Sequence, residues 1–299
     1  MSNYTGEAAG LLTSLFFAIN SVFITKAGQQ VGAVVSNRTR VAFALVYLVM
    51  LNLIFYQQPL AFQADAKRWA WLSLSGLVGL ALGDAFLFQC YLSIGPRLGN
   101  LLLSLSPVIA TLEAWTFLHE GLRAGQVLGI VLALAGIVWV VLERSNGREP
   151  VPHHVTWGII FGILSAVCQA TGLVFSRQGL YDHFPPIQAN AIRMLAAAIA
   201  LWAIALIQGQ IGQTVGSLRA HPNAFKFLIA AGLIGPVLGV SLSLLAVQNA
   251  EVGVASTLTS LTPVFMLPIS ALVFKEQLKW QAIAGTMLAM VGVALLFLI

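Results

Sequence analysis

The chain has 299 residues, of which 59% are hydrophobic and 8% are charged, and its formal net charge is +5. Soluble globular domains carry about 25% charged residues, so this composition excludes a soluble enzyme or binding domain and indicates that lipid surrounds most of the chain. The positive charges lie mostly at the breaks between apolar runs, which suits membrane anchoring better than nucleic-acid binding.

Apolar runs long enough to cross a bilayer follow one another along the whole sequence, since a helical span needs about 20 mostly apolar residues. Short connectors separate these runs, and no soluble domain of any size remains between them. We therefore predict an all-α polytopic membrane protein with ten transmembrane helices. In chain order, the predicted spans cover residues 7–27, 37–56, 69–91, 97–118, 124–143, 155–177, 187–208, 224–248, 252–274 and 279–298.

One Pro-containing segment occurs twice in the sequence. Leu105–Glu120 reads LSPVIATLEAWTFLHE, and it returns 156 positions later (261 − 105 = 156) as LTPVFMLPISALVFKE, Leu261–Glu276. A period this long indicates two duplicated halves rather than a solenoid. The same offset aligns Gly76/Gly232, Gly79/Gly235, Gly83/Gly239, Pro107/Pro263, Gly129/Gly285 and Gly136/Gly292.

The two halves are predicted to be inverted five-helix repeats. Residues 1–144 form the first repeat, residues 145–154 a polar linker, and residues 155–299 the second repeat. Because five is an odd number, the second repeat enters the bilayer upside down, and inverted repeats tend to place a binding site near the midplane between them. The opening helices match more loosely, with Asn37-x-x-Arg40 resembling Asn190-x-x-Arg193.

Two acidic residues lie well inside predicted spans, Asp84 in the third and Glu113 in the fourth. An ionisable residue at such a depth costs about 2.5–3.5 kcal/mol on insertion scales and faces the bundle interior or a cavity. Each carboxyl is therefore a candidate for proton coupling. The alternative for each is a structural carboxyl that is protonated or paired with a neighbouring helix.

Other polar and aromatic side chains inside the spans are candidates for substrate binding. Asn20 and Gln169 lie near mid-depth on the first span of each half, where an amide offers both a donor and an acceptor to a zwitterion. The hydroxyl groups either line a polar path or hold helices together, and the aromatic rings either contact an apolar solute or pack. With Asp84, the remaining candidates are Gln89, Tyr91, Ser106, Trp115, Ser241 and Thr262.

Pro107 and Pro263 are predicted to act as bending points of their helices. A proline inside a span removes an intrahelical hydrogen bond, which membranes tolerate where neighbours or a cavity satisfy the backbone. Other motifs are missing from the sequence: there is no GxxxxGK[ST] phosphate loop, no HExxH and no paired CxxC. We therefore expect no ATP motor, no metal site, no cofactor and no enzymatic activity.

These features resemble the drug/metabolite transporter superfamily, and within it the EamA-type exporters. The resemblance rests on Leu105-Ser-Pro-Val108 running to His119-Glu120, and on the second copy ending at Glu276, and it covers nearly the whole chain. The chain looks most similar to bacterial exporters of aromatic and other neutral amino acids. The resemblance implies a central cavity lined by the first, third, fourth, sixth, eighth and ninth spans.

The same resemblance implies a multi-pass protein of the bacterial inner membrane with both termini in the cytoplasm. The distribution of Lys and Arg points the other way, because cytoplasmic loops usually carry the excess of these residues. Ten of the 15 lie in or near the predicted loops opposite the termini, Arg38 and Arg40 among them, and five lie in or near those on the side of the termini, Arg193 among them.

The predicted function is secondary-active or facilitative export of amino acids, aromatic and other neutral ones, and related small metabolites by alternating access. One alternative is a transporter of nucleosides, sugars, drugs or a lipid-linked group. An alternative from another class is a membrane-embedded enzyme. The expected partners are a small-molecule solute and the lipid bilayer, without nucleic acid, and we expect the chain to act as a monomer.

Overall fold

The computed structural model describes residues 5–117, 123–145, 153–182, 184–249 and 257–298. Within these ranges the regular structure is helical and no β-strand occurs. The first half contains α1 (Thr5–Val31), α2 (Ala33–Tyr56), α3 (Ala66–Ser75), η1 (Gly76–Gly83), α4 (Asp84–Ile94), α5 (Pro96–Leu103), α6 (Ser106–Phe117) and α7 (Ala124–Ser145). The second half contains α8 (His153–Gly179), α9 (Pro186–Ile207), α10 (Ile211–Ala220), α11 (Pro222–Gly232), η2 (Leu233–Gly239), α12 (Val240–Asn249), α14 (Thr262–Val273) and α15 (Trp280–Leu298).

The all-helical membrane architecture predicted from the sequence is confirmed. Of the described helical stretches, 7 are long and apolar enough to cross a membrane. The remaining predicted spans coincide with two shorter apolar stretches, Thr257–Val273 and Trp280–Leu296, and with the broken pair α5 and α6. Helix length by itself therefore supports fewer than ten crossings. The predicted connector from Gly209 to Asn223 is not a simple loop, because α10 occupies most of it.

In each half, the repeated proline lies in the first turn of a helix, α6 or α14. In the first half, α5 ends at Leu103, the chain turns at residues 104–105, and α6 begins at Ser106. The second half turns at residues 260–261 and resumes with α14, which has Pro263 in its first turn. Proline suits the first turn because its missing N–H has no partner there in any helix. Both copies thus interrupt a span at the same place.

The repeated glycines lie in two π-helical segments, η1 and η2, which the sequence did not predict. The Asp84 N–H donates to the carbonyl of Gly79, five residues earlier, and the Val240 N–H donates to the carbonyl of Gly235. Each π-helix joins two α-helices into one rod across the bundle. Such segments are rare and often mark functional sites.

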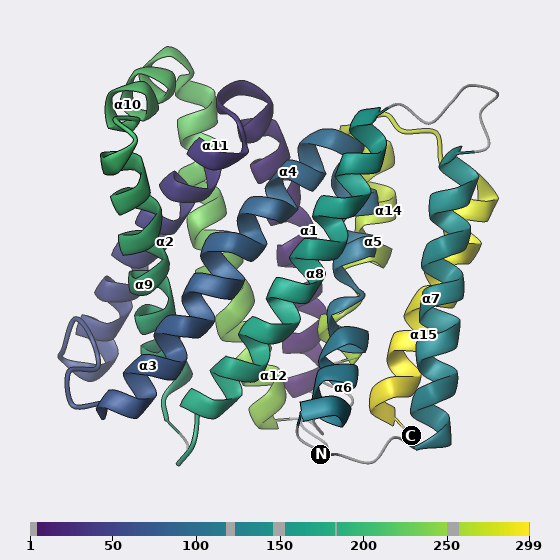
Figure 1. Ribbon diagram of the computed structural model, residues 1–299, viewed down its shortest axis with the longest axis horizontal. Coiled ribbons are helices and arrows are strands. Elements are labelled where there is room, and N and C mark those ends of the chain that lie inside the picture. Colours follow the sequence, from purple (N-terminus) through teal and green to yellow (C-terminus); the bar gives the residue numbers. More distant parts are fainter. Residues whose placement is uncertain (1–4, 118–122, 146–152, 183, 250–256, 299) are drawn as a thin grey trace.

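The helices form an elongated bundle in which α7 and α15 lie side by side at one end of the long axis and α9 and α10 lie at the other (Figure 1). The equivalent helices α7 and α15 run antiparallel: Gly129 faces Gly292, and Gly136 faces Gly285. The two pairs have the same sum of residue numbers (129 + 292 = 421 and 136 + 285 = 421), as antiparallel contact requires.

Candidate functional site: a cavity between the two halves

A cavity of about 340 Å³ lies in the middle of the bundle. Small-molecule sites range from about 300 to 1,000 Å³, so this volume suits one small solute. Both halves contribute to the lining, and both interrupted spans and both π-helical rods reach it. Its polar, proline and ionisable lining residues include Asn20, Arg40, Asp84, Asn100, Ser104, Ser106, Pro107, Gln169, Asn190, Arg193, Thr259, Ser260, Thr262 and Pro263.

Most of the residues predicted from the sequence reach this cavity. Those that line it are Asn20, Asp84, Tyr91, Ser106, Pro107, Gln169, Thr262 and Pro263. Three predicted substrate-binding residues are not among its described lining residues: Gln89, which is exposed, Trp115, which is 50% exposed, and Ser241. Glu113 also lies outside the lining, on α6, where its Oε1 accepts a hydrogen bond of 2.7 Å from Thr171. The roles assigned to all these residues stay predictions.

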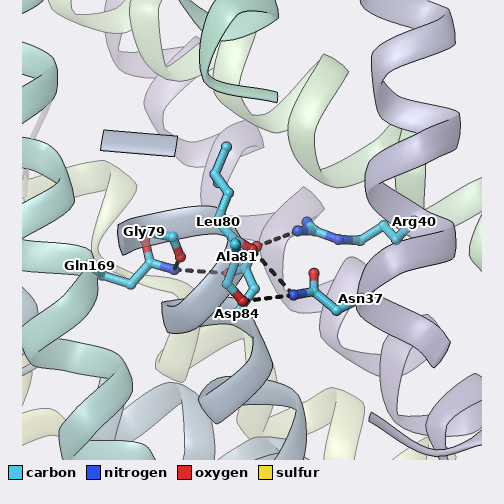
Figure 2. A network of polar contacts seen from close by, with 7 residues as sticks. All are labelled: Asn37, Arg40, Gly79, Leu80, Ala81, Asp84 and Gln169. Atoms are coloured by element: carbon cyan, nitrogen blue, oxygen red, sulfur yellow. Dashed lines mark hydrogen bonds and ion pairs between the residues drawn. The ribbon is translucent and has the colours of Figure 1, made fainter. Parts of the chain in front are cut away.

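Asp84 is the centre of a polar network at the junction of η1 and α4 (Figure 2). Its Oδ2 forms an ion pair with the Arg40 guanidinium from α2, and its Oδ1 accepts a hydrogen bond of 2.8 Å from Gln169 Nε2 on α8. Gln169 Nε2 also lies 3.2 Å from the carbonyl of Gly79, which it donates to. The network therefore ties the π-helix of the first half to the first helix of the second half.

Two asparagines satisfy carbonyl groups of the π-helices in the same way. Asn37 Nδ2 donates to the carbonyls of Leu80 and Ala81, at 3.2 and 3.1 Å (Figure 2). Asn190 Nδ2 donates to the carbonyl of Pro236, at 3.1 Å. The positions correspond, because Leu80 and Pro236 are 156 residues apart (236 − 80 = 156). In lipid every backbone group needs a protein partner, so these amides help to stabilise the π-helices.

Three arginines that were counted above with the loop cations lie inside the bundle. Arg38 is buried and donates to Thr214 and Gln210, at 2.9 and 2.8 Å. Arg40 and Arg193 line the cavity, each seven residues after the start of its helix (40 − 33 = 7 and 193 − 186 = 7). The sequence contained a signal for Arg40 and Arg193, because the repeated Asn-x-x-Arg pattern marked these two residues as equivalent. Without these three arginines, eight Lys and Arg residues remain on the side opposite the termini and four on the side of the termini (10 − 2 and 5 − 1). The excess therefore stays on the side opposite the termini.

The charges in the cavity differ between the two halves. Arg40 has a counterion in Asp84, whereas the equivalent of Asp84 in the second half is Val240 (84 + 156 = 240). Arg193 makes no ion pair and no side-chain hydrogen bond with any residue that the structure describes. One carboxylate and two guanidinium groups therefore line the same cavity.

Residues 4–142 and residues 156–298 each match the model of the EamA-like transporter family. The chain belongs to the EamA-like transporter family. The superfamily resemblance and the two-repeat architecture predicted from the sequence are thus confirmed.

Relatives of this EamA-like chain are also transporters by name. It is 26% identical over 239 residues to an uncharacterized transporter of Synechocystis sp., covering 75% of this chain and 70% of the relative. It is 24% identical over 214 residues to a "probable amino-acid metabolite efflux pump" of Salmonella typhimurium, covering 70% of each chain. A solved crystal structure at 18% identity matches with a TM-score of 0.58, over 98% of this chain and 96% of that chain, which shows a shared fold.

Proposed function

We propose that this EamA-like transporter exports neutral amino acids, aromatic ones included, and related small metabolites by alternating access. The observation that carries the proposal is a cavity that both halves line and whose volume suits one small solute. Both interrupted spans contribute polar residues to its lining. The efflux pump of Salmonella typhimurium supports the choice of cargo by its name. The modest cavity volume favours a small solute over a lipid-linked group.

The antiparallel contact of α7 and α15 supports the inverted arrangement of the repeats. Counting the broken pair α5 and α6 as one span, and the two shorter apolar stretches as one each, gives ten crossings (7 + 1 + 2 = 10). An even number places both termini on one side, as the neighbouring ends of α1 and α15 do in Figure 1. We assign that side to the cytoplasm of a bacterial inner membrane, and a reporter fused after Ile299 that reported the periplasm would contradict this assignment.

The cargo is testable by counterflow in liposomes that contain the purified protein. We expect labelled neutral amino acids to accumulate against an internal pool of the same solute, at a rate at least about tenfold above protein-free liposomes. Nucleosides and sugars should give no such exchange. Exchange of nucleosides or sugars without any exchange of amino acids would overturn the proposed cargo, and a chemically altered solute would indicate an enzyme.

Glu113 is the more suitable of the two predicted proton-coupling residues. Protonation of Asp84 would break its ion pair with Arg40, whereas a protonated Glu113 keeps a hydrogen-bonding partner in Thr171. We expect Glu113→Gln to abolish uptake driven by a pH gradient while counterflow continues. Asp182→Asn, at an exposed turn, serves as the matched control. Unchanged pH-driven uptake in Glu113→Gln would remove this residue from the coupling mechanism.

A further inference from the structure

The cavity is lined by two guanidinium groups, those of Arg40 and Arg193, and by one carboxylate, that of Asp84. Both oxygens of Asp84 are engaged, Oδ2 by Arg40 and Oδ1 by Gln169. Arg193 Nε is buried, and it lacks a hydrogen-bond acceptor among the described residues. Asp84 also attracts the charge of Arg193, but one carboxylate neutralises only one of the two guanidinium groups, and an excess positive charge in a membrane interior is costly. The cavity is therefore complementary to a solute that carries a negative group.

The same cavity contains a buried acceptor without a donor, on a helix of the other half. Asn20 Oδ1 is buried on α1, and it accepts no hydrogen bond from the part of the chain that the structure describes. Leaving a buried acceptor unpaired costs about 1–3 kcal/mol, so a solute that donates a hydrogen bond here would recover this energy.

The two unpaired groups lie against equivalent points of the two π-helices. A Cβ on Gly79 would lie 3.7 Å from Arg193 Nη2, and a Cβ on Gly235 would lie 2.7 Å from Asn20 Cγ. The missing side chain of Gly235 thus leaves room for Asn20, whereas the approach of Arg193 to Gly79 is an ordinary van der Waals distance. Because Gly79 and Gly235 correspond in the repeat, the positive group and the acceptor face the cavity from opposite halves of the protein.

We propose that Arg193 and Asn20 are the two poles of a zwitterion site. The Arg193 guanidinium binds the carboxylate of an α-amino acid, a group that its planar fork fits in a bidentate manner. The Asn20 amide oxygen accepts a hydrogen bond from the ammonium group of the same solute. This inference rests on the proposed function, and it adds that a free carboxylate and a free amino group are what the transporter recognises.

The test compares solutes that differ in one pole at a time. Counterflow of labelled L-phenylalanine and of L-threonine is measured with purified protein in liposomes, and L-phenylalaninamide and N-acetyl-L-phenylalanine are added as competitors. Truncating one side of a buried charged contact costs about 2–5 kcal/mol, so each derivative should compete at least about 30-fold less well than L-phenylalanine.

Variants assign each pole to its residue. In Arg193→Gln, the preference for L-phenylalanine over its amide should fall to within about threefold, because the carboxylate loses its partner. In Asn20→Ala, the preference over the N-acetyl derivative should fall, while the preference over the amide remains. Arg219→Gln, an exposed arginine on α10, should keep both preferences. A structural defect alone would lower transport of all solutes without changing these ratios.

The outcomes separate this inference from the proposed function. If neither amino acid exchanges, the proposed cargo fails and the zwitterion site fails with it. If the wild-type protein exchanges amino acids but accepts the amide as well as the acid, the inference is overturned and the proposed function stands. If folded Arg193→Gln still prefers L-phenylalanine over its amide, the inference is likewise overturned and the proposed function stands. Should that variant not fold, the ranking of competitors by the wild-type protein still decides.

Discussion

Asp84→Leu is expected to lower the free energy of unfolding by about 3–5 kcal/mol and to abolish transport, because it leaves the Arg40 guanidinium buried without its counterion. Arg40 has few other partners: its Nε is buried without an acceptor among the described residues, and the guanidinium lies 5.1 Å from the centre of the Phe88 ring. Unfolding by SDS in mixed micelles measures the change in stability.

The double variant Asp84→Leu/Arg40→Met is the decisive control for that prediction. Replacing both members of a buried ion pair by apolar groups is often neutral, whereas removing one member is strongly destabilising. We therefore expect the double variant to recover most of the stability and none of the transport. If the double variant were as unstable as Asp84→Leu, the loss would come from packing and not from the unpaired charge.

A more exposed ion pair gives a matched comparison. Arg97 and Glu276 approach to 2.9 Å, and their side chains are 14% and 27% exposed, against 6% and 9% for Arg40 and Asp84. The Arg97–Glu276 pair is only partly buried, so its charges lose less hydration than those of Arg40 and Asp84, and Glu276→Leu should cost less than Asp84→Leu. Equal costs would contradict the importance of burial at Asp84.

Gly136→Ala and Gly292→Ala are each expected to lower the free energy of unfolding by about 1–3 kcal/mol, because the added methyl group overpacks the contact between α7 and α15. A Cβ on Gly136 would lie 2.4 Å from the backbone nitrogen of Ala289, and one on Gly292 would lie 2.2 Å from that of Ala133. Backbone atoms cannot turn aside as side chains do, so the two helices must separate.

Gly216→Ala is the matched control, since a Cβ there would meet no atom within 4 Å. In the middle of α10 this change should be neutral or stabilising by up to about 1 kcal/mol, because alanine favours helices over glycine. Wild-type stability in both Gly136→Ala and Gly292→Ala would show that α7 and α15 do not pack at this distance in the membrane.

The sequence predicted the architecture because membrane spans and the repeat are local or periodic signals. Hydrophobic length identified most of the helices, and Gly76, Gly79 and Gly83 with their copies identified equivalent segments of the two halves. The π geometry of those segments was not predictable in this way. It depends on donors from other helices, such as Asn37 on α2 and Gln169 on α8, that reach the carbonyls of η1.

Placement of the candidate site residues depended on helix phase. In an α-helix each residue turns by about 100°, so Tyr91, seven residues after Asp84, returns to the same face and lines the cavity. Gln89, five residues after Asp84, points about 140° away and is exposed. The arginines were harder to place, because a cation near a helix start resembles a loop cation until its buried partner is known.

The shared π-helices also say something about the ancestry of the chain. A π-helix holds more residues per turn than an α-helix, and the two halves carry theirs at equivalent positions, where Asn37 and Asn190 donate to equivalent carbonyls. The simplest history places this irregular turn in a half-length ancestor, before the gene duplicated. Asp84 corresponds to Val240 in the other half, so the difference between a carboxylate and an apolar side chain at this position arose after duplication. The two copies thus differ in their charges: Arg40 has a partner within the protein, and Arg193 is the residue to which we assign the carboxylate of the cargo.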